Sequence, residues 1–466
     1  MLYVKSTILK DNYLISLIFL SIFWLIFLIL YISEYTLLLN DYSWSVFFVL
    51  IILIIYILRF INKVDLINLY SLFFMTSLMF IGGRFIGVFL GYDKAPIFEM
   101  DFFIYKILND LESTKLFLIV SMGFISLEIG LYFSYLFFKK NNNTKKLISS
   151  NKFVLYTLLI VLLFSLIQKL YTSYQAVILG GYLGLFEKQS EVYSLNIFSF
   201  LKVVFLASFG LFLSQRDYKI RAIFIILMII YFSFDAFLGG RGGLICFLIF
   251  IAWYYYDCGR KKISISKVFI YIVAILFFLS SLFNLISLRG EDANVNFGMY
   301  EGIIGLIYNQ GFTLMVFNES MYLTDYPIIP YFQNFIPGTS FVSSLFLGPI
   351  RPYENSFASF ISYSLNPSMF NAGFGLGWSF FGDSFRYGME NPILFSLFVI
   401  CFSIFINYIQ INIYSNIYIQ VVGISLVSSI LFLPRSSLSS VFPLLFYILF
   451  IYLFVALLSS LFKRNR

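Results

Sequence analysis

The run LISLIFLSIFWLIFLILY, at residues 14–31, carries no charged side chain and is long enough as a helix to cross the hydrocarbon core of a bilayer. Similar runs recur along the chain. Of its 466 residues, 61% are hydrophobic and 12% are charged, which is more apolar surface than a soluble protein of this length could bury. We therefore predict an all-α polytopic membrane protein. Because the first run lacks a small-residue cleavage site, we interpret it as a span and not as a signal peptide.

Apolar runs that could span the membrane divide the chain into three parts. The twelve runs cover residues 14–31, 46–58, 66–90, 116–138, 153–170, 197–213, 222–238, 244–256, 268–286, 393–409, 418–433 and 441–458. The expected organisation is nine spans within residues 1–288, a large outer loop domain over 289–390, and three spans within 391–466. This loop is too polar for a pair of spans and too aromatic for a disordered linker, so we expect short helices at the membrane surface.

Basic residues orient the predicted spans. Nineteen of the 31 Lys and Arg residues fall on alternate connections or on the two ends of the chain, against four acidic residues. Since positive charge is retained on the cytoplasmic side, both termini are predicted to be cytoplasmic. Topology also accounts for the net charge of +8, so no nucleic-acid partner is expected.

Several catalytic chemistries are excluded by residue types. The chain has no histidine, which removes Ser-His-Asp triads, His-ligated metals and His-dependent acyl transfer. Its three cysteines, Cys246, Cys258 and Cys401, lie in apolar stretches without metal-ligand spacing, and we interpret them as small hydrophobic residues. We expect no metal and no other cofactor.

The C-terminal part uses arginine where the rest of the chain uses lysine freely. Between Lys267 and Lys463 the cations are all arginine: Arg289, Arg351, Arg386 and Arg435. Topology explains why few cations remain on the outer side, but it does not explain why they are all arginine. The planar guanidinium, with five donors, is suited to phosphate.

Arg241 lies in the turn Leu238-Gly239-Gly240-Arg241-Gly242-Gly243, which the topology places on the outer face. The glycines permit a tight turn and close backbone approach. Arg241 would then begin the next helix, where free N–H groups and the positive end of the helix dipole also attract anions. A simple turn charge is the alternative.

The other arginines also have local alternatives. Arg435 lies in Leu433-Pro434-Arg435-Ser436-Ser437, where either serine could cap the next helix. Arg289 could complement a helix dipole or extend to the interface, Arg351 could pair with Glu354, and Arg386 could form a local salt bridge with Asp383. Arg84, after Gly82-Gly83, is a weaker candidate of the same kind.

Carboxylates are less informative than the arginines. Glu354 and Asp383 are candidates for a catalytic base, and Glu319 and Asp325 lie in the same loop, although most such groups are solvated or paired. Glu128 and Asp235 lie in or near expected spans, where a buried carboxylate is costly and suggests a function. Pairing of Asp235 with Arg241 is an alternative.

Taken in order, these motifs resemble those of the Wzy-type O-antigen polymerases of bacterial inner membranes. The resemblance covers the layout of about twelve spans with one large periplasmic loop. Locally it rests on the residues from Gly239 to Ile245, Ser287-Leu288-Arg289-Gly290, Phe335-Ile336-Pro337, Arg351-Pro352, the glycine-rich stretch 372–377, and the Arg435 turn.

The resemblance implies a glycosyltransferase of GT-C-like architecture that needs no metal. Such an enzyme would transfer the growing glycan from undecaprenyl pyrophosphate to the non-reducing end of an incoming lipid-linked repeat unit at the periplasmic face. Arg241, Arg289, Arg351 and Arg435 would hold pyrophosphate, with Arg386 as a further candidate. Membrane lipid, a chain-length regulator and a flippase are the implied partners.

Three alternatives remain open. An O-antigen ligase shares the architecture, but the ligase family uses a periplasmic histidine, which this chain lacks. A lipid-linked oligosaccharide flippase or other transporter would be expected to carry cations within its spans and not at their outer ends. A membrane scaffold would not need arginine at glycine turns.

Overall fold

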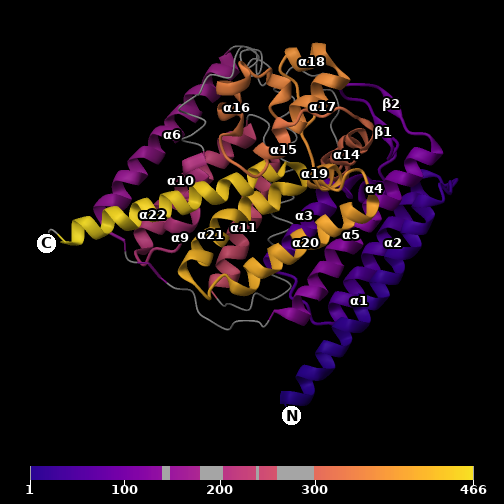
Figure 1. Cartoon of the computed structure of the whole chain (residues 1–466), viewed down its shortest axis with the longest axis horizontal. Helices are drawn as coiled ribbons and strands as arrows, with labels where there is room; N and C mark the ends of the chain where they lie inside the picture. The colour runs from indigo at the N-terminus through magenta and orange to yellow at the C-terminus, as the bar shows by residue number, and fades with distance from the viewer. Residues whose placement is uncertain are drawn as a thin grey trace. The chain divides into compact units, whose positions relative to one another are not determined.

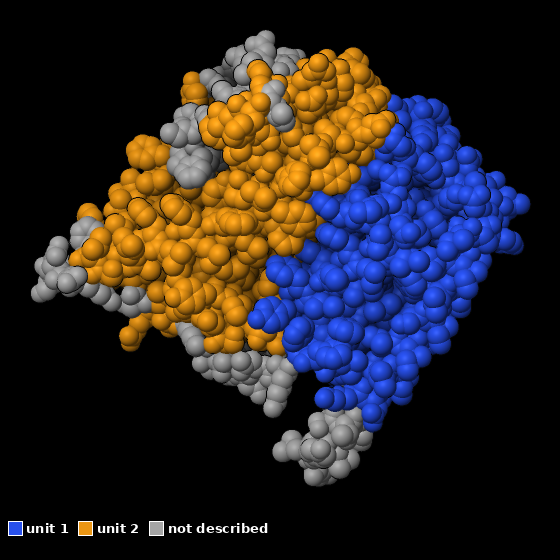
Figure 2. Space-filling model, viewed as in Figure 1, with its two compact units in different colours: residues 1–139, 255–324, 376–408 blue, residues 140–254, 325–375, 409–466 orange. Residues whose placement is uncertain are grey.

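The computed structural model describes residues 2–138, 147–148, 150–178, 203–237, 241–259 and 299–464 (Figure 1). These residues are largely helical, which confirms the predicted all-α class, and include one short antiparallel pair of strands, β1 (Glu99–Met100) and β2 (Lys106–Ile107). The chain divides into two compact units (Figure 2). Unit 1 comprises residues 1–139, 255–324 and 376–408, and unit 2 comprises residues 140–254, 325–375 and 409–466.

Six helices within the described residues are long and apolar enough to cross a membrane, so the protein is a polytopic membrane protein. They cover Lys10–Ile32, Asp41–Ile61, Asp110–Phe137, Pro392–Asn412, Ile417–Arg435 and Leu438–Leu461. A bent pair of helices gives a seventh candidate. Three shorter apolar helices, Lys152–Gln168, Val203–Leu213 and Gly242–Tyr256, lie where the sequence predicts the fifth, sixth and eighth spans. The predicted span at 268–286 lies outside the described residues.

Unit 1 is built around α5, whose central residues are almost all buried. Its helices are α1 (Leu2–Ile32), α2 (Asp41–Ile61), α3 (Leu69–Phe80), α4 (Gly83–Phe89), α5 (Asp110–Phe137), α13 (Met299–Gln310), α14 (Thr313–Tyr322), α19 (Phe380–Tyr387) and most of α20 (Pro392–Asn412). Gly130 of α5 packs directly on Ser403 of α20, whose hydroxyl donates to the Leu127 carbonyl at 2.7 Å. Small residues of this kind allow membrane helices to approach closely.

The run predicted as one span at residues 66–90 is two helices, α3 and α4, bent by 70° at the break between them. The pair still counts as one candidate span, but it is broken, which the sequence did not indicate. The physical reason lies in Gly82 and Gly83. A Cβ on Gly82 would lie 2.7 Å from the Phe48 ring, and one on Gly83 would lie 2.5 Å from the Ile307 carbonyl oxygen. The bend thus brings α4 against α13 with backbone in direct contact.

Unit 2 contains the longer helices α6 (Lys152–Ile178), α10 (Tyr218–Phe237), α11 (Arg241–Gly259), α21 (Ile417–Phe432) and α22 (Phe442–Arg464), with the short α9 (Phe209–Leu213). Gly210 of α9 has no room for a side chain because the Val421 carbonyl of α21 occupies that position. Its N–H donates to Ser425 Oγ at 2.7 Å. Glycine and serine therefore join α9 and α21 at backbone distance.

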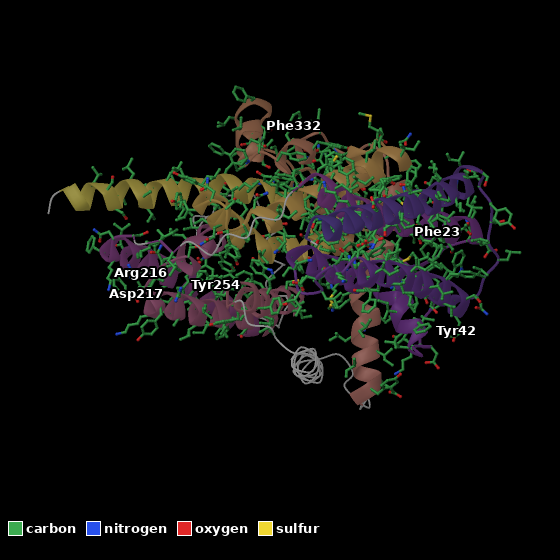
Figure 3. All side chains as sticks on the ribbon, turned by 90° about the horizontal axis from the view of Figure 1, so that it is seen from below. Phe23, Tyr42, Arg216, Asp217, Tyr254 and Phe332 are labelled. Carbon is green, nitrogen blue, oxygen red and sulfur yellow. The ribbon has the colours of Figure 1, made fainter. Side chains whose placement is uncertain are left out.

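Short helices form most of the described segment between residues 299 and 387. Besides α13, α14 and α19 of unit 1, they are α15 (Ile329–Gln333), α16 (Thr339–Leu347), the 3-10 turn η2 (Pro352–Glu354), α17 (Phe357–Leu365) and α18 (Pro367–Asn371) of unit 2. Phe332 of α15 is half exposed and projects outward (Figure 3). Because the segment contributes to both units, the domain boundary at 289–390 stays a prediction.

Candidate functional site

A helix begins at Arg241, as the sequence predicts, while residues 238–240 lie outside the described residues. α11 begins at Arg241 and continues to Gly259, with Gly242 and Gly243 in its first turn. The first backbone N–H groups of a helix have no partner within the helix and attract anions. The Arg241 side chain lies outside the described residues, but its backbone lies at the N-terminus of α11.

Arg435 ends the 3-10 turn η3 (Leu433–Arg435), which follows α21 directly. The predicted serine cap is also present: Ser437 accepts a hydrogen bond from the Ser439 N–H at the start of η4 (Leu438–Ser440). The charge of Arg435 lies within electrostatic range of Cys246, which is five residues beyond the start of α11. Arg435 and the helix that Arg241 begins therefore belong to the same unit, and the charge of Arg435 acts on the second turn of that helix.

Side-chain contacts tie the Arg435 turn to the loop segment that precedes α16. Ser437 Oγ donates to Asn334 Oδ1 at 2.6 Å, and the rings of Phe335 and Phe442 lie 5.0 Å apart. Ser340 of α16 hydrogen-bonds in turn to Asn355, immediately after η2. The first two contacts join segments more than a hundred residues apart in sequence, since 103 positions separate Ser437 from Asn334.

Arg351 stands at the N-terminal side of η2 with its side chain exposed. Its Nη1 donates to Tyr353 Oη at 2.5 Å, and Tyr353 stacks on Tyr363 with ring centroids 3.9 Å apart. The hydrogen bond to Tyr353, assisted by the charge of Glu354, raises the pKa of Arg351 above its usual value. The guanidinium of Arg351 thus stays charged. Tyr353 holds it through Nη1, and the side chain is otherwise exposed to solvent. Glu354, the nearest candidate base, is half-buried.

Asp383 and Arg386 lie on α19 in unit 1, whereas Arg351 and Arg435 belong to unit 2. Asp383 is fully buried and accepts a hydrogen bond from Trp378 Nε1 at 2.8 Å. Arg386 is also buried. Its Nη1 pairs with Glu390 at 2.7 Å, and its Nη2 donates to the Ser320 carbonyl. The salt bridge of Arg386 is therefore local, but its partner is Glu390 and not Asp383.

Two further sequence candidates have different outcomes. Arg289 lies outside the described residues. Arg84 is buried in α4 and donates to the carbonyl oxygens of Ile97 and Glu99, the first at 2.8 Å. Arg84 therefore holds the loop between α4 and β1, a contact that the glycines before it did not indicate.

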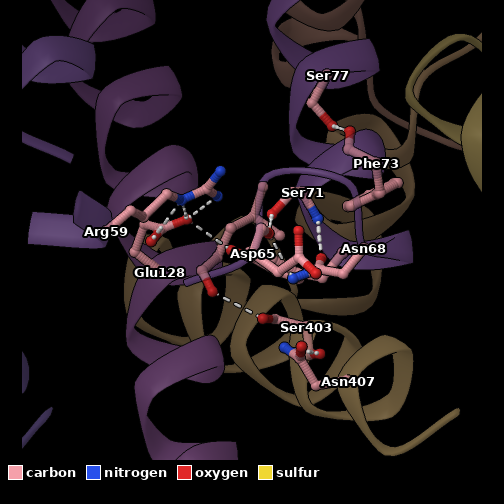
Figure 4. Close-up of polar contacts among 11 residues, drawn as sticks. Arg59, Asp65, Asn68, Ser71, Phe73, Ser77, Glu128, Ser403 and Asn407 are labelled. Atoms are coloured by element: carbon pink, nitrogen blue, oxygen red, sulfur yellow. Dashed lines mark hydrogen bonds and ion pairs between the residues drawn. The ribbon is translucent and has the colours of Figure 1, made fainter. Parts of the chain in front are cut away.

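Glu128 has a partner that the sequence did not reveal. Arg59 of α2 forms an ion pair with it in unit 1, and Tyr70 of α3 donates its hydroxyl to the same carboxylate at 2.9 Å (Figure 4). The positive-inside rule predicts a cytoplasmic connection for Arg59, and the sequence indicates no partner for Glu128. The available indication was that a carboxylate inside a span needs a cation nearby. The side chain of Asp235 lies outside the described residues.

A comparison with protein families decides what kind of protein carries this arrangement. The family model described as O-antigen polysaccharide polymerase Wzy matches residues 15–466. The chain belongs to the Wzy family. Searches of curated proteins and of solved structures gave no match.

Membership of the Wzy family confirms the resemblance and the activity predicted from it. Wzy polymerases join lipid-linked O-antigen repeat units, so the protein is a glycosyltransferase that acts on polyprenyl-diphosphate-linked units. The Wzy assignment does not identify the residues that bind substrate.

Proposed function

We propose that this Wzy polymerase transfers the growing glycan from undecaprenyl pyrophosphate to the non-reducing end of an incoming lipid-linked repeat unit. The acceptor hydroxyl oxygen forms a bond to the anomeric carbon of the donor sugar. The bond from that carbon to the pyrophosphate oxygen breaks, and its electron pair leaves with undecaprenyl pyrophosphate. The hydroxyl proton passes to a protein carboxylate.

The observation that carries this proposal is the position of Arg435 near the first turns of α11, the helix that Arg241 begins. A departing diphosphate gains negative charge as the bond breaks. Fixed guanidinium groups and helix N–H groups stabilise that charge most strongly where water is scarce. Arg351 of the same unit, which donates to Tyr353 with one nitrogen and has its side chain exposed, would supply further donors.

Five arginines are proposed to bind pyrophosphate: Arg241, Arg289, Arg351, Arg386 and Arg435. They are not equivalent. Arg386 already engages Glu390 and the Ser320 carbonyl, which makes it a weaker candidate than the exposed Arg351. Of the two proposed bases, Glu354 is favoured over Asp383. Glu354 lies within electrostatic range of Arg351 in unit 2, whereas Asp383 is buried against Trp378.

The proposed setting is the periplasmic face of the bacterial inner membrane. We propose about twelve spans with both termini in the cytoplasm, nine of them within 1–288 and three within 391–466, and a GT-C-like architecture with a periplasmic loop domain over 289–390. The distribution of lysine and arginine supports this topology. A flippase that supplies repeat units and a chain-length regulator are the proposed partners.

Deletion of the gene, followed by gel analysis of lipopolysaccharide, tests the function. A strain without the polymerase should retain core with a single repeat unit and lose the ladder of longer chains. Complementation with the intact gene should restore the ladder. Loss of every repeat unit, including the first, would instead identify a ligase or a flippase and contradict the proposal.

A further inference from the structure

A polar cavity lies in unit 1, between α13 and the loop that follows α4. Its volume is about 280 Å³, and its lining includes Tyr92, Asp93, Tyr300, Glu301 and Asn309. Ligand sites commonly measure roughly 300–1,000 Å³, so this cavity is at the small end of that range. It suits a single sugar residue better than a whole repeat unit.

Two glycines create the space. Gly302 and Gly305 lie three residues apart on one face of α13, and Asn309 continues that face. A Cβ on Gly302 would meet nothing within 4 Å, and one on Gly305 would meet only the edge of the Tyr92 ring at 3.7 Å. The cavity therefore exists because this strip of α13 lacks side chains.

The walls are held rigidly. Tyr92 stacks on Tyr308 with ring centroids 4.1 Å apart and an interplanar angle of 17°. The Tyr308 hydroxyl donates to the Pro96 carbonyl at 2.5 Å, and the Tyr300 hydroxyl donates to the Leu90 carbonyl at 3.0 Å. Since α13 also packs on α4 through backbone contact at Gly83, the loop and the helix are fixed to each other.

The chemistry of the lining selects among possible ligands. Asp93 and Glu301 outnumber the single cation Lys94, so a diphosphate would be repelled. The polar groups also disfavour a lipid tail. Sugar rings have an apolar C–H face and a rim of hydroxyl groups, which match tyrosine rings beside carboxylate and amide groups. Burial raises the pKa of Tyr92 above its usual value, so its hydroxyl remains a hydrogen-bond donor at neutral pH.

We propose that this cavity is a saccharide-binding subsite that holds one sugar residue of the O-antigen glycan during chain growth. The inference rests on the proposed polymerase function, because a transferase that extends a glycan must retain chains of increasing length. It assigns to unit 1 a role in glycan binding that is separate from the pyrophosphate binding proposed for Arg241, Arg351 and Arg435 of unit 2.

The test uses the full-length protein in lipid nanodiscs, with delipidated single repeat units from the strain's own O-antigen as the probe. Binding is measured by saturation-transfer NMR and by calorimetry. The variant Gly302→Leu should weaken binding at least tenfold, because the new side chain enters the cavity. Ser33→Leu adds the same side chain at an exposed turn of unit 1 and should bind like the wild type.

Asn309→Ala provides a second variant that removes an exposed side chain and does not threaten folding. It should weaken binding several-fold. In cells, both cavity variants should shorten the lipopolysaccharide ladder while the first joined repeat units persist. Wild-type binding by both variants, or no binding by the wild type, would overturn the subsite even if polymer forms. If the wild-type gene produced no polymer when returned to the deletion strain, the polymerase function itself would be contradicted.

Discussion

Arg59 and Glu128 form an ion pair in which both side chains are buried, although 69 positions separate them in the chain (Figure 4). Arg59 Nε donates to Glu128 Oε1 at 3.1 Å, and the guanidinium carbon lies 4.0 Å from the centre of the Phe74 ring. Tyr70 supplies a further donor to the carboxylate. The pair thus connects α2, α3 and α5 at one point inside unit 1.

Removing one member of this pair should destabilise the protein strongly. Glu128→Gln leaves the Arg59 charge buried without its counter-charge, for which the expected loss is about 3–5 kcal/mol. Thermal unfolding of the detergent-purified protein measures this loss. Replacing both residues by apolar ones, as in Arg59→Met with Glu128→Leu, should recover most of the stability.

The exposed pair Lys115–Glu34 is the matched control, because its Glu34 side chain is 64% exposed. Lys115→Ala should change stability by no more than about 1 kcal/mol. If Glu128→Gln were as mild as this control, the Arg59–Glu128 pair would not hold unit 1 together.

Sequence reasoning identified one half of this pair and not the other. A carboxylate within an apolar run is recognisable from local sequence, and Glu128 was recognised in this way. Its partner depends on how α2 and α5 pack, which no local pattern reveals. Arg59 follows an apolar run, so the positive-inside rule accounts for it without any partner. Each residue therefore has its own local explanation, and the sequence does not indicate that Arg59 and Glu128 contact each other.

The geometry of guanidinium should matter at Arg241 and Arg435. Replacement of either residue by alanine should reduce polymerisation about 100-fold, the usual effect of losing one fixed donor to a developing oxyanion. Replacement by lysine should recover little, because an ammonium group cannot present the same planar fork. Repeat-unit polymerisation by membranes that contain each variant provides the measurement.

Arg216→Ala is the control for these variants. Arg216 is an exposed arginine of the same unit, beside Asp217 and next to α10 (Figure 3). It should leave polymerisation unchanged. Full activity in Arg241→Lys and Arg435→Lys would show that only charge is needed, which contradicts a fork-shaped diphosphate contact.

The two candidate bases should respond differently to substitution. Glu354→Gln should lower kcat by about 10²–10⁴-fold without loss of stability, as expected for a general base. Asp383→Ala should instead lower stability by about 1–3 kcal/mol, because the buried Trp378 N–H loses this acceptor. Measuring kcat and the unfolding temperature of both variants separates the roles. A stable but inactive Asp383→Ala protein would reverse the assignment.

Gly210→Val should disrupt the packing of α9 on α21. The new side chain would overlap the Val421 carbonyl, and overpacking of this kind typically costs about 1–3 kcal/mol. The unfolding temperature and the yield of folded protein report the effect. Gly302→Val is the comparison, since a side chain there meets open space. Equal stability of the two variants would contradict the close contact of α9 and α21.

Local features were predicted more successfully than packing. The start of α11 at Arg241 and the serine cap after Arg435 follow from glycine, proline and serine within a few residues of each other. The bend between α3 and α4 does not, because residues 66–90 form an uninterrupted apolar run whose glycines are needed for contacts with Phe48 and Ile307. Similarly, nothing near Arg435 in sequence indicates Asn334.

The discontinuity of unit 1 has a consequence for its biosynthesis. The surface of α4 at Gly83 meets its neighbour on α13 only after residue 307 has left the ribosome, and Ser403 reaches Gly130 later still. The faces of α4 at Gly83 and of α5 at Gly130 therefore remain unpacked in the membrane until the later helices are inserted. For the same reason, a recombination event at a single junction between two such genes would separate surfaces that evolved together. We expect functional hybrids to exchange all three segments of the unit at once.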